Sequence, residues 1–252
     1  MDFGDQRQRS IFYEVHRDLP REGPGNRAST ARALACIDDL PARPRVLDVA
    51  CGPGQQTLYL AALLPEAAIT AIDRHPPFLA ELERRAHKAG TTARIGAVRA
   101  NMAALPFRPG TFDVIWCEGA AYIIGFQSAL ETWAPLLARG GSIALTEPVW
   151  LRKEVPEVVA RNWDEYPAMT DAAGCIARIE RAGLVARADF VLDEAAWWDN
   201  YYGPMAKRIE VVAAKHRGDA VAEGVLRECR DEIDVYRGHS DCYGYAFFIV
   251  SR

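Results

Sequence analysis

Apolar and polar residues follow one another along this chain in two different patterns. Short apolar runs between turn residues are typical of buried strands, whereas apolar residues three or four positions apart indicate helices. The runs that predict strands lie at residues 46–49, 68–72, 94–98, 112–117, 142–146, 184–192 and 245–250. The spacing predicts helices over residues 58–64, 76–89, 126–138, 172–182 and much of 194–237. Strands and helices in repeated alternation predict an α/β fold with a doubly wound parallel sheet.

The first forty residues precede this alternation and predict two helices. Apolar residues at helical spacing between Phe12 and Leu19 predict a first helix that lies on the main domain. After the Gly-Pro-Gly break at residues 23–25, Ser29 or Thr30 can cap a second helix over residues 31–40.

A glycine-bearing turn follows the first predicted strand. Residues 46–57 read VLDVACGPGQQT, which predicts a strand, a tight turn and the start of a helix. Such a turn exposes backbone N–H groups at a helix N-terminus, where a small polar or anionic ligand can bind. Asp48 adds a negative charge there, so a cationic ligand suits the site better than a pyrophosphate does.

Polar residues follow the predicted strands at the ends where ligands bind. Because the carboxyl ends of parallel strands meet at one edge of a sheet, we expect these side chains to form one rim. Asp73 lies nineteen residues after Gly54, a position from which an acid can reach ribose hydroxyls. The predicted rim consists of Asp48, Asp73, Asn101, Glu118 and Glu147.

The residues Asp48, Gly52, Gly54 and Asp73 together resemble the cofactor fingerprint of class I S-adenosylmethionine-dependent methyltransferases, with Ala50 in place of the first of three alternate glycines. The block at residues 136–145 is similar to the "L-x-P-G-G" block of that superfamily. Segments 21–25, 116–122 and 243–248 look like a bacterial branch of UbiE-like small-molecule methyltransferases. The resemblance implies a Rossmann-like methyltransferase fold with seven strands, mostly parallel, and cap insertions. In that fold the seventh strand lies antiparallel between the fifth and sixth.

The resemblance also implies roles for individual residues. Asp48 and the Gly52–Gly54 backbone would hold the amino acid end of S-adenosylmethionine, and Asp73 would take the ribose hydroxyls. Asn101 and Met102 would flank adenine, with Asn in place of the commoner Asp. Glu118 would lie near the sulfonium. The expected cofactor-binding residues are Asp48, Ala50, Gly52, Gly54, Gln56, Thr57, Asp73, Arg74, Asn101, Met102 and Glu118.

The implied chemistry is an in-line displacement at a methyl group that positive sulfur already activates. The protein must align the acceptor at about 3–3.5 Å and exclude water. A base is needed only if the nucleophile arrives protonated. The catalytic candidates are Glu118, Tyr122 and Glu147, followed by Tyr13 and His75. Each candidate also has a non-catalytic interpretation. Glu118 could be a solvated loop acid, Tyr122 could belong to the core, and Glu147 could be a structural hydrogen-bonding group.

We expect one domain with four parts. These are an N-terminal helical cap (1–40), a cofactor-binding core (41–147), a lid insertion (148–171) and a C-terminal half with a helical cap and the last strands (172–252). Segments 1–25 and 149–171 are expected to close over the acceptor as mobile covers. The Trp/Tyr cluster at residues 197–202 is more simply interpreted as core under a cap. The residues that could instead form apolar walls around the acceptor are Trp150, Trp163, Trp197, Trp198, Tyr201 and Tyr202.

The composition of the chain limits the classes of partner that we expect. The formal net charge is −4 and no Lys/Arg block occurs, so nucleic acid is not expected as a partner. No apolar run approaches the about 20 residues of a membrane span, and no signal peptide is recognised. Six scattered cysteines without Cys-x-x-Cys predict neither disulfides nor a metal site. We therefore expect a cytoplasmic protein acting on a small molecule through an oxygen, nitrogen or carbon nucleophile, with a homodimer left open.

Three alternatives compete with this interpretation. A nicotinamide-dependent oxidoreductase needs a third glycine, where this chain offers Gln56 or Thr57. A nucleic-acid or protein methyltransferase would carry an Asn/Asp-Pro-Pro-Tyr box after the fourth strand, where this chain has Glu-Gly-Ala-Ala at residues 118–121. A protein that binds the sulfonium cofactor without transferring methyl stays open.

Overall fold

The computed structural model of the chain describes residues 5–252, so residues 1–4 of the predicted N-terminal cap lie outside the described residues. Seven strands form one sheet in the order β3-β2-β1-β4-β5-β7-β6. β7 is antiparallel to both of its neighbours, and the pairs from β3 to β5 are parallel. The predicted sheet, with an antiparallel seventh strand between the fifth and sixth, is confirmed. The strands are β1 (Arg45–Val49), β2 (Ala68–Asp73), β3 (Ile95–Arg99), β4 (Phe112–Cys117), β5 (Leu137–Trp150), β6 (Val185–Val191) and β7 (Tyr243–Ser251).

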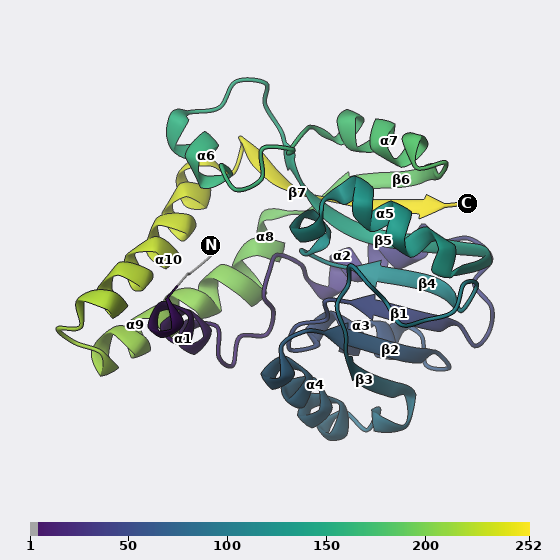
Figure 1. Cartoon of the computed structure of the whole chain (residues 1–252), viewed down its shortest axis with the longest axis horizontal. Helices are drawn as coiled ribbons and strands as arrows, with labels where there is room; N and C mark the ends of the chain where they lie inside the picture. Colours follow the sequence, from purple (N-terminus) through teal and green to yellow (C-terminus); the bar gives the residue numbers. More distant parts are fainter. Residues whose placement is uncertain (1–4) are drawn as a thin grey trace.

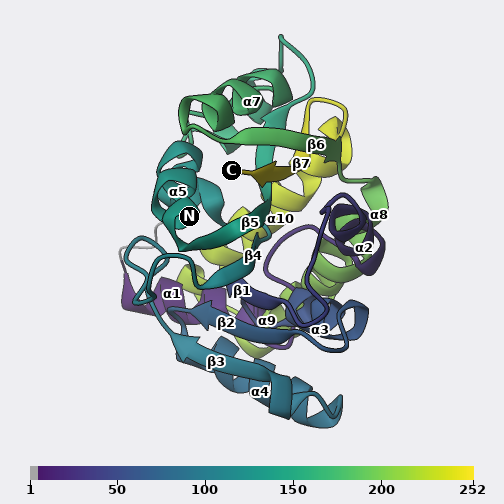
Figure 2. The same cartoon turned by 90° about the vertical axis from the view of Figure 1, so that its right-hand side faces the viewer.

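Helices cover both faces of the sheet (Figure 2). Alternate residues of a strand point to opposite faces. Val46 accordingly lies in one apolar cluster with residues of α2 and α3, whereas Leu47 lies in another with residues of α5 and α7. The first face carries α2 (Arg27–Ala35), α3 (Gln55–Leu63) and α4 (Pro76–Lys88), and the second carries α5 (Phe126–Trp133) and α7 (Ala172–Arg181).

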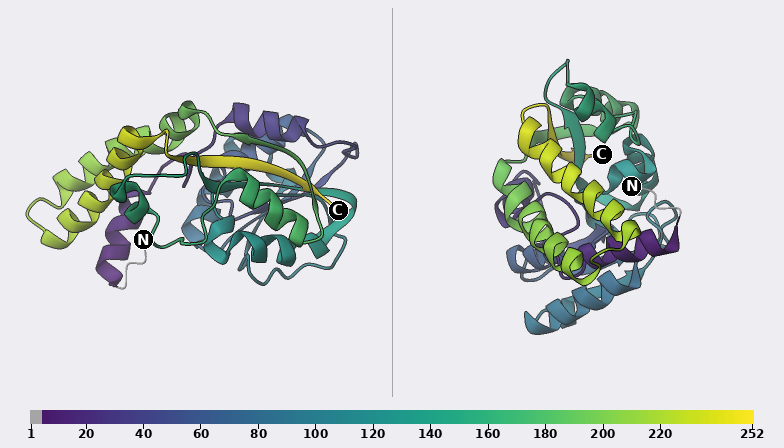
Figure 3. Two further views of the ribbon diagram at one scale, coloured as in Figure 1. Left: turned by 90° about the horizontal axis from the view of Figure 1, so that it is seen from above. Right: turned by 90° about the vertical axis from the view of Figure 1, so that its left-hand side faces the viewer.

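The remaining helices form a cap beyond the carboxyl ends of the parallel strands (Figures 1 and 3). α1 packs against α9 and α10, and α6 packs against α10, so segments from the two ends of the chain meet in this cap. A π-helical turn, η4 (Trp198–Tyr202), links α8 to α9. The cap helices are α1 (Gln6–Val15), α6 (Glu157–Asn162), α8 (Glu194–Trp197), α9 (Gly203–Lys215) and α10 (Ala220–His239).

The second helix begins earlier than the sequence predicts. Its N-cap is Asn26, whose side chain accepts a hydrogen bond from the Ser29 N–H, while the Ser29 hydroxyl accepts one from the Asn26 N–H. Ser29 is therefore the third helical residue, and the prediction that Ser29 or Thr30 caps a helix over 31–40 is wrong. The helix ends at Ala35, and Asp39 adopts a left-handed conformation with φ of 54°.

The fifth strand is longer than predicted, and the helix before it is shorter. α5 ends at Trp133 because Pro135 follows, and a 3₁₀ turn leads into β5 at Leu137. Antiparallel pairing with β7 continues from Ser142 to Trp150, so β5 extends past Glu147. The prediction that the strand ends at Glu147 is wrong, since this residue lies inside β5.

The described residues contain neither a disulfide nor a helix suited to a bilayer. All six cysteines fall within residues 5–252 and carry free thiols. The longest described helix is α10, with 20 residues, and charged side chains recur along its length. No helix within residues 5–252 combines the length and apolar character needed to span a membrane.

The close approach of α3 to α4 generates a test of the fold. Gly54 has φ of 87°, and a methyl group added to it would lie 2.3 Å from Leu82 Cδ1. We expect Gly54→Ala to lower the free energy of unfolding by about 2–4 kcal/mol through backbone strain and overpacking. The control Gly110→Ala has a similar φ of 71° and open space around it, so about 1 kcal/mol is expected. Urea-induced unfolding measures both; equal losses would contradict the close approach.

Candidate active site

The glycine turn after β1 is held against the neighbouring elements. The N–H of Cys51 donates to the Ile72 carbonyl of β2 at 2.8 Å, and the Gln56 side chain of α3 donates to the Cys51 carbonyl at 2.9 Å. Three of its residues have positive φ, namely Ala50, Gly52 and Gly54. Ala50 is the strained member, because an alanine in this region costs about 1–2 kcal/mol. Strain that persists in this way is typical of ligand-binding turns.

Asp48 lies beside this turn with one carboxylate oxygen unpaired. The side chain is fully buried, and the Thr57 hydroxyl donates to Oδ2 at 2.5 Å, while Oδ1 has no hydrogen-bond partner. Burial raises the pKa of Asp48 to about 7, against the lowering effect of the Thr57 bond. An unpaired buried carboxylate oxygen is costly, and a cationic ligand group at this position would satisfy it.

Asp73, at the end of β2, is hydrogen-bonded to the glycine turn. Its two oxygens accept hydrogen bonds from the backbone N–H groups of Gly52 at 3.0 Å and His75 at 2.8 Å. Each carboxylate oxygen has a second lone pair, so the group can accept two further donors. The residue stays 9% exposed. Its position and remaining lone pairs fit a pair of ribose hydroxyls.

Glu118 is held by three donors in a buried site. Arg21 donates to Oε2 at 2.6 Å, while Trp116 Nε1 and the Thr30 hydroxyl donate to Oε1 at 2.7 and 3.1 Å. The side chains of Glu118 and Arg21 are 0% and 3% exposed. A carboxylate with this set of partners is fixed in place and orients the side chains around it.

Tyr122 and Glu147 lie farther along the rim. Glu147 is buried inside β5, where the Tyr166 hydroxyl donates to Oε1 at 2.5 Å and Oε2 has no partner. Burial raises the pKa of Glu147 to about 8. Tyr122 is half-buried; its ring centroid lies 5.6 Å from that of Tyr166, and burial raises its pKa to about 12. Glu147 therefore has a free oxygen and a pKa suited to proton transfer near neutral pH.

The predicted adenine contacts lie at a more exposed edge. Asn101 is exposed, and its Oδ1 accepts the Ala103 N–H at 3.0 Å. Met102 is half-buried, and its carbonyl accepts the Trp133 Nε1–H at 2.9 Å. Arg74 is exposed next to Asp73. The described contacts thus join Asp48, Asp73 and the glycine turn directly, and they leave Asn101 and Arg74 at the surface.

The segment before α2 supplies contacts that the sequence did not identify as functional. Besides Arg21, Glu22 lies against the glycine turn: a methyl group on Gly52 would be 3.4 Å from Glu22 Cγ. His16 Nδ1 and Glu22 Oε2 are 2.6 Å apart, and burial raises the pKa of Glu22. Arg21 and Glu118 are 97 positions apart, so no local pattern could reveal their pairing.

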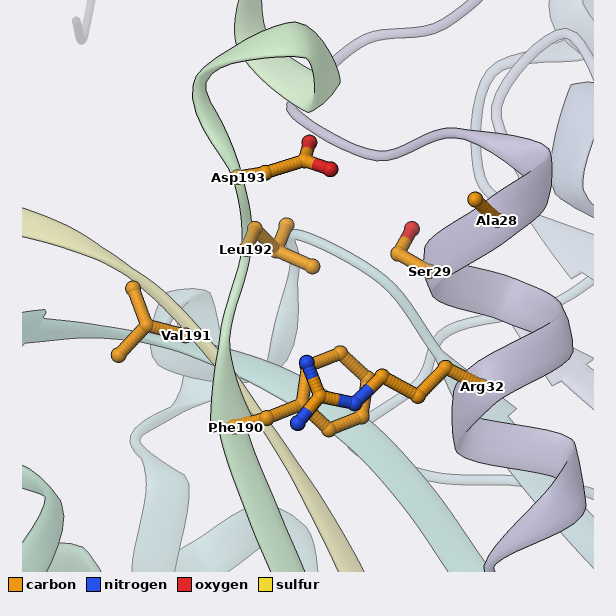
Figure 4. A pocket seen from close by; sticks show the side chains of 7 residues that line it. All are labelled: Ala28, Ser29, Arg32, Phe190, Val191, Leu192 and Asp193. Atoms are coloured by element: carbon orange, nitrogen blue, oxygen red, sulfur yellow. The ribbon is translucent and has the colours of Figure 1, made fainter.

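Two hollows on the surface lie away from these acids. One, of about 120 Å³, lies between α2 and the segment that leaves β6, with the Arg32 guanidinium 4.0 Å from the centre of the Phe190 ring (Figure 4). The other is lined by Arg27, Ala28, Ala31 and Leu63. Neither is lined by a residue of the glycine turn or the rim. The turn and the rim are therefore the candidate active site, since Asp48 and Glu147 each have an unpaired carboxylate oxygen.

The buried ion pair generates a second test. Arg21→Gln would leave the Glu118 carboxylate buried without a cation, and we expect it to lower the free energy of unfolding by about 3–5 kcal/mol. Adding Glu118→Gln should recover part of this loss, because the uncompensated charge is then removed. The exposed pair Arg161–Glu157 gives the control: Arg161→Gln should cost less than about 1 kcal/mol. Additive effects of the two buried substitutions in urea unfolding would contradict the coupling.

Known proteins resemble this chain in sequence and in fold. A family model described as a methyltransferase domain matches residues 46–141. The trans-aconitate 2-methyltransferase of Methylobacterium nodulans is 30% identical over 63% of this chain and 68% of its own length, and the demethylmenaquinone methyltransferase of Thermus thermophilus is 34% identical over 41% and 46%.

A solved structure of a SAM-dependent methyltransferase from Thiobacillus denitrificans, in complex with S-adenosyl-L-homocysteine, matches with a TM-score of 0.83 at 21% identity over 100% of both chains. The chain spans less than half the length of several other curated relatives that it matches. Together with the glycine turn and the order of the strands, these matches show that the chain belongs to the class I S-adenosylmethionine-dependent methyltransferase family, in its UbiE-like branch.

Proposed function

We propose that this protein binds S-adenosylmethionine and transfers its methyl group to a small-molecule acceptor. The observation that carries the proposal is the unpaired Oδ1 of buried Asp48 beside the glycine turn, with Asp73 at the end of the next strand. A ligand with a cationic amino acid at one end and a ribose at the other satisfies both acids. The acidic chain without a Lys/Arg block favours a small acceptor over nucleic acid.

Each part of the turn receives a role in this proposal. Asp48, held by Thr57, would accept the ammonium group, and the backbone of Gly52 and Gly54, whose N–H groups donate to Asp73 and to the Cys51 carbonyl, would pack against this end of the cofactor. Asp73 would accept the ribose hydroxyls. The remaining contacts, to adenine and around the turn, would come from Ala50, Gln56, Arg74, Asn101 and Met102. When bound, S-adenosylmethionine would supply an electrophilic methyl group on positively charged sulfur.

The acceptor would lie between the rim and the cap. We assign the proton-accepting role to Glu147, because one of its oxygens is unpaired, and place Tyr122 beside it as a hydroxyl that orients the acceptor. Glu118 acts through Arg21 as a positioning residue. The segments 5–25 and 149–171 would cover the reaction and exclude water.

Binding and transfer test the proposal together. Calorimetry should show S-adenosylhomocysteine binding and no NADH binding, and a radiolabelled methyl group should enter the small-molecule fraction of a metabolite extract. Asp73→Asn should weaken S-adenosylhomocysteine binding by about 1–3 kcal/mol, because the ribose loses a charged acceptor. Asp38→Asn, an exposed acid before β1, is the control. NADH binding alone, or label only in protein or nucleic acid, would refute the proposed function.

Asp48 predicts a pH dependence of cofactor affinity. With a pKa of about 7 before binding, its carboxylate is largely charged at pH 8 and largely protonated at pH 6. A cationic amino group binds the charged form, so affinity falls as the pH drops through 7, by about tenfold between pH 8 and pH 6. Calorimetry with S-adenosylhomocysteine at both pH values measures this. Asp48→Asn should bind weakly and lose the dependence; an unchanged dependence would assign it to another group.

A further inference from the structure

Four tyrosines form a layer between the cap and the sheet. Tyr201 and Tyr202 of η4 both donate to Glu232 Oε1 of α10, at 3.2 and 3.0 Å. The ring centroids of Tyr122, after β4, and Tyr245 of β7 both lie 6.3 Å from that of Trp163. Burial raises the pKa of each of these phenols, so they stay protonated at neutral pH. We call Tyr122, Tyr201, Tyr202 and Tyr245 the phenol layer.

Carboxylates approach the phenol layer from more than one side. Glu232 and Glu147 both raise the pKa of Tyr122 and Tyr245, which places the layer within electrostatic reach of the two acids. The charge of Glu22, from the segment over the glycine turn, likewise raises the pKa of Tyr201. By geometry, the phenol layer meets an acid of the cap, Glu232, through Tyr201 and Tyr202, and an acid of the sheet, Glu147, through the Tyr166 ring next to Tyr122.

Three buried polar atoms beside the phenol layer have no partner. They are Oε2 of Glu147 and the hydroxyl of Tyr243, each on a residue that is 1% exposed, and Nε1 of Trp163, whose ring lies 5.5 Å from that of Tyr243. The charge of Glu232 raises the pKa of Tyr243, so this hydroxyl belongs to the same neighbourhood. Buried polar groups normally have hydrogen-bond partners, and three unpartnered atoms around one aromatic layer indicate a missing hydrogen-bonding ligand.

The described charges around the layer favour a positive ligand. Glu147 and Glu232 receive their hydrogen bonds from phenols rather than from basic side chains. Arg178 lowers the pKa of Glu147 from a distance, while its Nη2 donates to the Ala168 carbonyl. Basic side chains from the surrounding elements donate hydrogen bonds elsewhere, namely Arg21, Arg178 and Arg208.

Resting on the proposed function, we propose that the methyl acceptor is an amine that enters as an ammonium ion and binds between Glu232 and Glu147 against the phenol layer. Carboxylates and tyrosine faces both attract ammonium groups. A carboxylate acceptor would meet like charge in a low-dielectric site, which disfavours its binding. The preference separates this chain from relatives named for trans-aconitate, a polycarboxylate.

The reaction then requires one proton transfer. The ammonium group gives a proton to the Glu147 carboxylate, and the freed nitrogen lone pair forms a bond to the methyl carbon. The carbon–sulfur bond breaks with its electron pair retained by sulfur, which becomes a neutral thioether. The methylated nitrogen carries the positive charge that sulfur loses and is balanced by the Glu232 carboxylate, while Glu147 leaves the step as a neutral acid.

Binding to the S-adenosylhomocysteine-loaded protein tests the acceptor class without a known substrate. Calorimetry compares three probes of similar skeleton, which are phenethylamine, 2-phenylethanol and 3-phenylpropionate. We expect phenethylamine to bind at least tenfold more tightly than either of the others. Equal or tighter binding of the alcohol or the carboxylate would overturn the inference and leave the proposed function intact.

Glu232→Gln provides the matched variant. Glutamine keeps an acceptor for Tyr201 and Tyr202 but removes the charge, so phenethylamine affinity should fall tenfold or more while S-adenosylhomocysteine affinity stays unchanged. Glu228→Gln, exposed one turn earlier on α10, should change neither. Unchanged amine binding in Glu232→Gln would overturn the inference. Absence of S-adenosylhomocysteine binding to the unmodified protein would refute the proposed function on which it rests.

Discussion

The ion pair between Arg21 and Glu118 joins three segments that are remote in sequence. Glu118 follows β4, Thr30 belongs to α2 and Arg21 precedes it, so one carboxylate fixes the end of a central strand, a helix and the chain that enters it. Burying such a pair adds little net stability, but it penalises every arrangement that separates the charges. The segment from residue 21 to 25 is consequently held over the glycine turn, where Glu22 lies against Gly52.

A second constraint is the excess of acid at the carboxyl ends of the strands. Asp48 and Glu147 each have an unpaired oxygen, and burial raises the pKa of both. Without a cation, these groups hold protons near neutral pH, which relieves the cost of burying their charge. In the proposed function the positive charges come from ligands, so binding and deprotonation are coupled. Asp48 and Glu147 would then both be ionised only when the ligands are bound.

The sequence predicts those features of the fold that the local pattern of residues determines. Apolar runs located the strands, and the residues from Asp48 to Gly54 located the turn, because glycine readily adopts the left-handed conformations that a tight turn needs. The remaining features depend on contacts between segments that are far apart in the sequence. The extension of β5 past Glu147 depends on β7, and the partner of Glu118 lies 97 residues away. Periodicity carries no information on either contact.

The π-helical turn at Trp198–Tyr202 has a consequence for how this site can change. A π turn holds one residue more than an α turn, and each helical residue rotates the following side chains by about 100°. Deleting a single residue there would restore a regular helix and swing both tyrosines away from Glu232. A homologue one residue shorter at this point would present different side chains to the same carboxylate. Insertion or deletion at η4 would thus change the side chains that face Glu232 and leave the glycine turn untouched.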